Sequence, residues 1–415
     1  MITRTDAEEI AAGWARRDSL LEGAEFEPVV DEFDLGFVVW TRRRVPDRSI
    51  LGGGTTVIDR ATGRLSTWPS VPTATVAQMY RQQHAAIVAP VRTADPELEL
   101  RRNARRRPTP TVAAHVTLDG RLIVARGVKG DQQLRHHPLV AQWLAGNAPG
   151  ELVRGAERHA EIVALSDALH EVDRLRAAEG LAPVTLAEAR QAMRDRASFE
   201  SFFVRERGDK LGGVPADLCG SCALCLVHFA LVPQVEVHAA RTVRIEPRPV
   251  PQPGRFPEDV GWALADGGWT AEPEDMMERF IAIRLEETAA KVGVGLESRL
   301  EPFEAAARAL ASMPFLSCHR RGPGLVHRIQ PFALVGEESA HCADTLAEFG
   351  RLIGSRVFPI GCDVDTSDPI VIDERGRLFA LDQGGEWFLG DSFDQGLVNL
   401  VAGGYQPRVR DDGTW

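Results

Sequence analysis

The sequence has few cysteines and no long apolar run. Six cysteines in 415 residues are too few for the disulfide framework of small secreted domains. No apolar stretch approaches the roughly 18–20 residues that a membrane-spanning helix needs. The N-terminal segment combines acidic residues with an amphipathic pattern, which differs from the basic and then apolar order of a signal peptide. These absences predict a cytoplasmic protein.

The composition is that of a soluble globular protein, with 44% hydrophobic and 26% charged residues. The length predicts two or three domains. Charge is uneven, since residues 101–240 carry 19 basic and 16 acidic side chains and residues 241–415 carry 18 and 28. The basic run RRNARRR at 101–107 is a candidate nucleic-acid contact. Because PTP follows it, we interpret it as a linker.

Residues 1–95 predict a small α+β domain. An amphipathic helix opens it, with Ile10, Ala11 and Trp14 on one face and Asp6 as the expected N-cap. Strand-like runs follow, and the glycine-rich LGGG at 51–54 reads as a turn. In order, GFVVWTRR, LGGG, TVIDRATGRL and a helix near VAQMYRQ resemble the YrhB-type immunity domain of bacterial toxin systems. The resemblance implies a protein-binding domain.

Residues 105–245 begin with a predicted hairpin, TVAAHVTL and RLIVARGV around a DG turn. A helix is expected from about residue 157 to Gly180. A second helix is expected over 185–203, where Thr185 and Glu188 have the spacing of a capping box. Strand-like residues at 234–245 and a proline-rich linker at 247–257 close this region.

The stretch ADLCGSCALCL at 216–226 contains three cysteines three residues apart. About sixty residues upstream, His159 and Glu161 stand two apart at a helix start. Together they match H-x-E and C-x-x-C, the signature of zinc-dependent deaminases. Catalytic zinc takes three protein ligands and a water molecule. An imidazole and two thiolates supply those ligands, and a carboxylate beside the metal can move protons.

Two cysteine pairs fit the spacing. Cys219 and Cys222 follow closely on Pro215 or Asp217, either of which can start a helix, so both thiols would lie in its first turn. A helix N-terminus also lowers a thiol's pKa. The alternative pair, Cys222 and Cys225, would lie one turn deeper. We favour the first pair and interpret Cys225 as a packing residue.

The segments ERHAEIVALSDAL and PADLCGSCALCL resemble the YwqJ-like deaminases of the cytidine deaminase superfamily. The resemblance implies a three-layer α/β/α sandwich that binds Zn²⁺. It also implies His159, Cys219 and Cys222 as zinc ligands and Glu161 as the catalytic proton shuttle. The substrate would be a nucleobase, a nucleoside or a nucleic acid. Residues 127–157 and 208–218 are the expected walls of its pocket.

Residues 259–405 predict a second α+β domain, with helices at 272–293, 301–313 and 339–354 and then strands and a closing helix. The motifs GWTAEPEDM, FPIGCDVD, IVIDERGRLFAL and WFLGDSFDQGLVNLVAGG resemble the third subgroup of the SUKH immunity proteins. The resemblance implies binding to a protein partner such as a toxin. The acidic CDVDTSDP lacks the glycine and closing glutamate of a calcium loop, so we expect a turn.

The sequence thus predicts a multidomain α+β and α/β protein with domains at 1–95, 105–245 and 259–405. The leading hypothesis is a zinc-dependent hydrolytic deaminase with flanking immunity-like domains, in a bacterial toxin and immunity setting. One alternative is a non-catalytic immunity or regulatory protein that binds and neutralises toxins. Another is a nucleic-acid-binding regulator, which would depend on RRNARRR alone.

Overall fold

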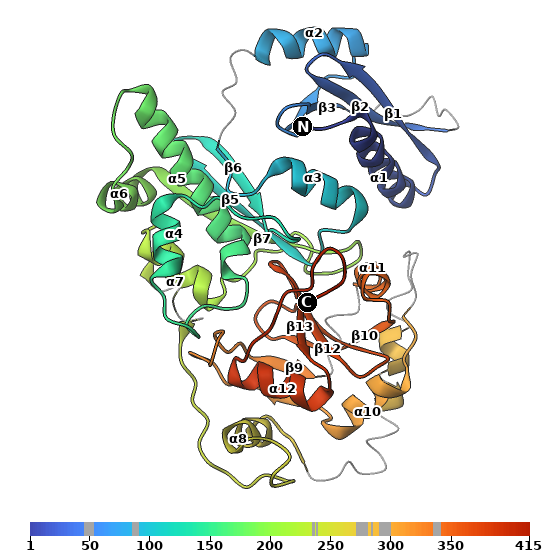
Figure 1. Ribbon diagram of the computed structural model, residues 1–415, viewed down its shortest axis with the longest axis vertical. Coiled ribbons are helices and arrows are strands. Elements are labelled where there is room, and N and C mark those ends of the chain that lie inside the picture. Colours follow the sequence, from blue (N-terminus) through green and yellow to red (C-terminus); the bar gives the residue numbers. More distant parts are fainter. Residues whose placement is uncertain are drawn as a thin grey trace. The chain divides into compact units, whose positions relative to one another are not determined.

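The computed structural model describes residues 1–44, 54–84, 91–234, 237, 240–270, 281–283, 285–289, 300–334 and 342–415. The chain forms two compact units, Met1–Pro108 and Thr109–Trp415 (Figure 1). Each unit is described by itself. Among the described residues, no helix combines the length and the apolar character that crossing a bilayer requires.

The first unit is built on a four-stranded antiparallel meander. Its strands are β1 (Phe26–Phe33), β2 (Gly36–Arg43), β3 (Thr55–Asp59) and β4 (Leu65–Trp68), and its helices are α1 (Arg4–Glu22), α2 (Thr73–His84) and α3 (Pro96–Arg105). Successive residues of β2 point to opposite faces of the sheet and pack in two separate cores, because the strand is pleated. Phe37 packs with residues of α1 and α3, and Val38 packs with residues of α2.

Two expectations for this unit were wrong. The N-cap of α1 is Thr3, and Asp6 is the third helical residue, whose carboxylate completes a capping box. The basic run is largely helical and not a linker, because Asp95 caps α3 and a proline follows it at the first helical position. Arg101 of α3 donates to the carboxylate of Asp6 at 2.9 Å. The predicted turn at 51–54 falls mostly on residues 51–53, which lie outside the described residues.

The second unit begins with a three-stranded antiparallel sheet in the order β6-β5-β7. We call residues 109–234 its central part. The strands are β5 (Thr111–Leu118), β6 (Arg121–Arg126) and β7 (Ala197–Val204), and the α-helices are α4 (Pro138–Ala145), α5 (Ala160–Ala178), α6 (Leu186–Arg196) and α7 (Gly220–His228). The predicted hairpin is confirmed, with Asp119 and Gly120 at φ 50° and 75° in its turn. Helix α5 packs on β5 and β6.

The helix predicted over 185–203 is wrong in its second half. It begins at the expected capping box of Thr185 and Glu188 but ends at Arg196. Residues Ala197–Val204 form β7, which pairs with β5 along its full length. Phenylalanine and valine side chains in this stretch favour a strand, and the pairing partner lies about eighty to ninety residues earlier.

We call residues 256–415 the C-terminal part of the same unit. Its sheet has six antiparallel strands in the order β13-β12-β11-β10-β9-β8, namely β8 (Ser317–Cys318), β9 (Phe332–Leu334), β10 (Val357–Asp363), β11 (Pro369–Asp373), β12 (Leu378–Asp382) and β13 (Gly385–Gly390). The helices α8 (Glu258–Asp266), α10 (Glu304–Ser312), α11 (Ala343–Ile353) and α12 (Phe393–Ala402) accompany it. One continuous core fills the space between them.

Most elements predicted for this part are present. The helix expected at 272–293 lies largely outside the described residues, although 281–283 and 285–289 are helical. The strand expected at 234–245 is not among the described elements. Four of its residues lie outside them, and Val243 forms an isolated bridge with Arg321.

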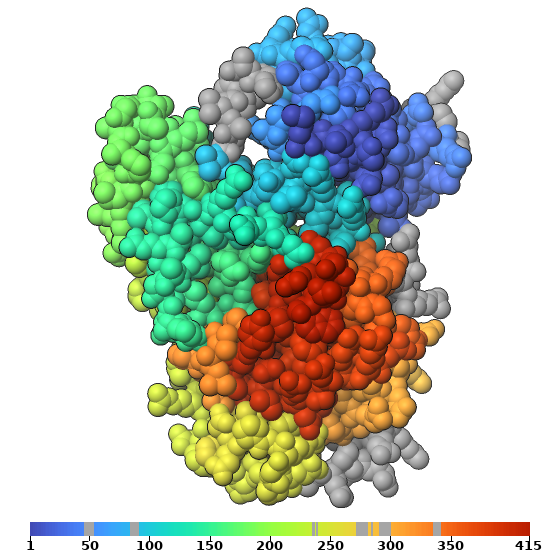
Figure 2. All heavy atoms as spheres, viewed as in Figure 1, coloured from blue at the N-terminus to red at the C-terminus, as the bar shows by residue number. Residues whose placement is uncertain are grey.

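The central and C-terminal parts share buried polar contacts. Gly150 exchanges backbone hydrogen bonds with Gly324 at 3.1 Å and Val326 at 2.9 Å. The carboxylate of Glu206 accepts from the backbone N–H of Thr345 at 2.6 Å. On the face shown in Figure 2, the green atoms of the central part border directly on the red C-terminal atoms. The two parts therefore form one folded body.

Candidate active site

Two helix N-termini present the predicted site residues. His159 is the N-cap of α5, which makes Glu161 its second helical residue. Cys219 is the N-cap of α7, which begins at Gly220, and its Sγ accepts from the backbone N–H of Cys222 at 3.5 Å. The helix thus starts later than Pro215 or Asp217. Both cysteines still lie within its first turn, where the free N–H groups stabilise thiolate.

His159, Cys219 and Cys222 converge although about sixty residues separate them in the chain. The Nδ1 atom of His159 lies 3.5 Å from Sγ of Cys219 and 3.4 Å from Sγ of Cys222. All three ligand atoms lie within 4.8 Å of one another. Bond lengths typical of tetrahedral zinc place a nitrogen and a sulfur ligand about 3.6 Å apart. The arrangement therefore fits a zinc-sized ion.

The electrostatics of the three residues also suit a cation. Burial by itself would lower the pKa of His159, but the Cys219 thiolate, Glu161 and Asp382 outweigh burial and raise it to about 10. The hydrogen bond from Cys222 and the charge on His159 lower the pKa of Cys219 well below its usual value. Among the described residues, Nε2 of His159 is buried without a hydrogen-bond partner. Imidazole and thiolate are ligands that zinc prefers.

Glu161 lies beside these ligands. Its Oε2 is 3.3 Å from Sγ of Cys222, and its side chain is only 1% exposed. Burial raises its pKa, so the protonated form is accessible at higher pH than for an ordinary glutamate. Cys225 lies one turn deeper in α7, is fully buried and is outside the group of three.

The structure adds Gln383, a residue that the sequence analysis missed. Gln383 lies between β12 and β13, and its Nε2 donates to Oε2 of Glu161 at 3.2 Å. Its Oε1 accepts from the backbone N–H of Ala160 at 2.9 Å. The nearby buried pair of Arg154 and Asp382, with Nε and Oδ2 2.8 Å apart, was also missed. No local pattern marks these residues, since their partners lie more than 220 positions away.

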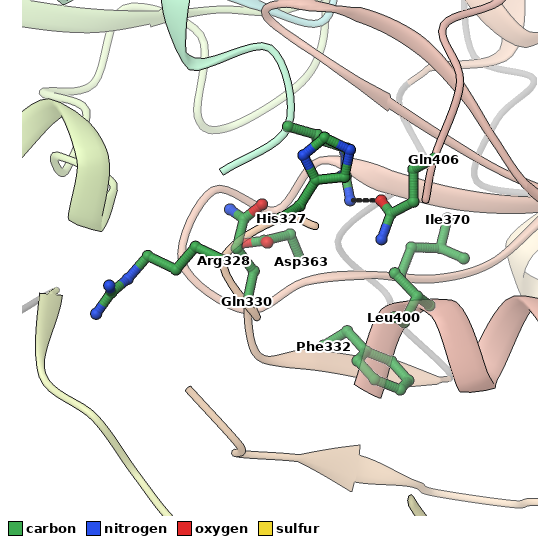
Figure 3. Close-up of a pocket in the computed structure, with 9 residues that line it drawn as sticks. His327, Arg328, Gln330, Phe332, Asp363, Ile370, Leu400 and Gln406 are labelled. Atoms are coloured by element: carbon green, nitrogen blue, oxygen red, sulfur yellow. Dashed lines mark hydrogen bonds between the residues drawn. The ribbon is translucent and has the colours of Figure 1, made fainter. Parts of the chain in front are cut away.

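A small cavity lies at the same junction (Figure 3). Arg154 of the central part lines it, and the C-terminal part contributes the residues that Figure 3 labels, which include His327, Arg328 and Gln406. The cavity has room for about one water molecule. It is too small for a nucleobase. The expected pocket wall at 127–157 instead contacts the C-terminal part, through Gly150 and Arg154.

Comparison with known families assigns three domains to this chain. The immunity protein 35-like domain matches residues 5–86, the YwqJ-like deaminase matches residues 97–231, and the SUKH-3 immunity protein matches residues 256–403. The match to a deaminase family therefore lies between matches to two immunity-protein families. This is the predicted order. A search of curated proteins and a search of solved structures each found no match.

The deaminase match begins inside α3, which the structure assigns to the first unit. Residues of α3 pack in one core with residues of α1. The finer limits predicted for the domains, 1–95, 105–245 and 259–405, stay predictions. So does the three-layer arrangement of the deaminase domain, of which the described part shows one sheet with α5 packed against it.

Proposed function

We propose that the protein is a zinc-dependent hydrolytic deaminase of a nucleobase, nucleoside or nucleic acid. His159, Cys219 and Cys222 would hold the ion and leave a fourth position for water. The observation that carries this proposal is the convergence of their three ligand atoms within 4.8 Å inside a region that matches a deaminase family. Zinc, when bound, acts as a Lewis acid that lowers the pKa of a water molecule.

The residues of this chain would perform the proton transfers. Glu161 lies next to the ligands without belonging to their cluster. Its carboxylate would take a proton from the attacking water and pass it to the ring nitrogen of the base. It would then take the second proton from the hydroxyl group added to the ring carbon and give it to the amino group, which leaves as ammonia. Its buried position supports this role, because burial raises the pKa of the carboxyl and so makes it a better proton acceptor than an exposed glutamate.

The flanking immunity-like domains would bind protein partners, such as toxins, in a bacterial toxin and immunity setting. Immunity proteins act by contact with another protein. The acidic balance of residues 241–415, with 18 basic and 28 acidic side chains, suits a basic partner surface.

The test combines metal analysis with ammonia release. The purified chain is expected to hold one zinc ion and, once the closed site has been opened by mutation, to release ammonia from cytosine, adenine or guanine, as free bases, nucleosides or polymers. Glu161→Ala is expected to keep the zinc and lose the release. A chain that holds no zinc after purification in zinc-containing medium would disprove the proposal.

A second function is favoured by the closure of the site. His159, Glu161, Cys219 and Cys222 are each at most 5% exposed. A protein that never admits substrate would be a non-catalytic immunity or regulatory protein with a structural zinc site. Bound zinc without ammonia release from any base, even after the site has been opened by mutation, would favour this function.

A further inference from the structure

Gln383 contacts two groups of the candidate site with a single carboxamide. Its Oε1 accepts from the backbone N–H of Ala160 at 2.9 Å, and its Nε2 donates to Glu161 at 3.2 Å. The orientation of the amide follows from Ala160, because a backbone N–H can only donate. Gln383 is 4% exposed, so these hydrogen bonds are shielded from water.

The turn between β12 and β13 places Gln383 there. Asp382, the last residue of β12, accepts on Oδ1 from the backbone N–H of Gly384 at 2.9 Å and from the indole of Trp387 at 2.8 Å. Its Oδ2 accepts from Arg154 of the central part. A second donor of Arg154 reaches Oε1 of Gln406 at 3.0 Å, the dashed line in Figure 3. The β12–β13 turn is therefore held both by hydrogen bonds within its own hairpin and by Arg154 of the central part.

Two glycines of the central part allow this close approach. A Cβ at Gly127 would lie 2.3 Å from the backbone oxygen of Gln383. A Cβ at Gly155 would lie 2.5 Å from the ring of Trp387. Both distances are shorter than real contacts, so any side chain there would displace the turn. The fit between the two parts is thus close at the backbone level.

The carboxamide has the shape of one edge of a base. It presents an oxygen and a nitrogen on one carbon, as does the edge of cytosine that joins the carbonyl to the unprotonated ring nitrogen beside the amino-bearing carbon. The corresponding nitrogen of guanine already carries a hydrogen, and adenine has a C–H where cytosine has the carbonyl. A base bound through this edge would place its oxygen on the N–H of Ala160 and its ring nitrogen on Glu161, the group proposed to move protons there.

We infer that Gln383 takes the place of this carbonyl–nitrogen edge against the N–H of Ala160 and the carboxyl of Glu161, so that the SUKH-3 domain inhibits the deaminase domain within one chain. This inference rests on the proposed function. The active form then requires the β12–β13 turn to leave the site, which separates Asp382 from Arg154. Bases that carry the carbonyl beside an unprotonated ring nitrogen, as cytosine does, are the substrate class.

A purely structural role of Gln383 predicts a different result. Ala160 is the first residue of α5, and its N–H has no partner within the helix. If Gln383 served only as a cap, removing its side chain would lower stability and leave ligand binding unchanged. Under the inference, the same change empties a binding site. Ligand binding therefore separates the two roles.

The experiment uses the full zinc-loaded chain and two small probes. The probe 2(1H)-pyrimidinone carries the carbonyl–nitrogen edge and has no amino group to lose, and purine lacks the carbonyl. Gln383→Ala removes the competing carboxamide. Gly127→Ala retains Gln383 and displaces the turn, which guards against a local effect of the first variant. Gln395→Ala is the matched control, since Gln395 is an exposed residue of α12.

Calorimetry is expected to show that Gln383→Ala and Gly127→Ala bind 2(1H)-pyrimidinone about tenfold tighter than the parent chain, the scale of one or two displaced hydrogen bonds. The affinity for purine should rise less, and Gln395→Ala should bind both probes with the affinity of the parent chain. Zinc transfer to a chromogenic chelator should also be faster in both variants. Unchanged affinity and transfer in zinc-loaded variants would overturn the inference and leave the proposed function intact. Absence of zinc from every chain would overturn both.

Discussion

The Nε atom of Arg154 lies 2.8 Å from Oδ2 of Asp382, across 228 positions of the chain. Both residues are 6% exposed. A buried ion pair contributes little relative to apolar packing, but removal of one partner leaves an uncompensated buried charge. The stability of the second unit therefore depends on this contact between its central and C-terminal parts.

Replacement of Arg154 by alanine is expected to lower the free energy of unfolding of the second unit by about 3–5 kcal/mol. Urea denaturation followed by tryptophan fluorescence would measure the change. Arg121→Ala is the control, because its pair with Glu171 leaves Arg121 60% exposed, and it should cost less than about 1 kcal/mol. Equal effects of the two variants would contradict this account of the junction.

Alanine in place of His159, Cys219 or Cys222 is expected to abolish stoichiometric zinc binding, because each change removes one of three protein ligands. Zinc content by elemental mass spectrometry measures this directly. Cys225→Ala is the matched control in the same helix and should retain one zinc per chain. Loss of zinc from the Cys225 variant, with retention in the Cys219 variant, would show that the alternative cysteine pair binds the metal.

Glu161→Gln, made in the Gln383→Ala chain, is expected to reduce ammonia release by roughly 10²–10⁴-fold, the usual contribution of a general acid–base group. Zinc content should stay at one, since Glu161 lies outside the ligand cluster. Glu157→Gln, a change two residues before His159, provides the control. Full activity of the Glu161 variant would assign proton transfer to another group.

Asp363 should make the second unit less stable as pH rises. Burial, followed by the charges of Asp365 and Asp368, raises its pKa to about 7, whereas an unfolded aspartate titrates near 3.9. The folded state thus holds the proton more tightly, and stability falls as pH rises from about 4 to about 7.

Asp363→Asn is expected to remove that slope and to stabilise the unit at pH 8 by at most about 4 kcal/mol. The asparagine oxygen can still accept from the backbone N–H groups of Asp365 and Thr366, as the aspartate does at 2.9 and 3.0 Å. Urea midpoints at pH 5 and pH 8 would measure the effect. If the stability of the variant depended on pH as that of the parent chain does, groups other than Asp363 would determine this dependence.

Local patterns were sufficient for most elements of the fold. The capping box of Thr185 and Glu188 and the Asp119–Gly120 turn act through neighbouring residues, so the sequence alone placed them correctly. Residues 197–204 were misassigned because their state depends on pairing with β5. The basic run at 101–107 was misread because Asp95 and Pro96, which start its helix, lie before it.

The residues of the candidate site likewise fall into those that a short motif marks and those that only the folded chain brings there. His159, Glu161, Cys219 and Cys222 were nominated from two short motifs, because metal ligands on a helix start must keep a fixed spacing. Their roles stay predictions, and the fold supplies the distances between them. Gln383 has no such spacing. It reaches Glu161 only because a hairpin 222 positions away packs there, and packing between distant segments depends on shape and burial that no short motif encodes.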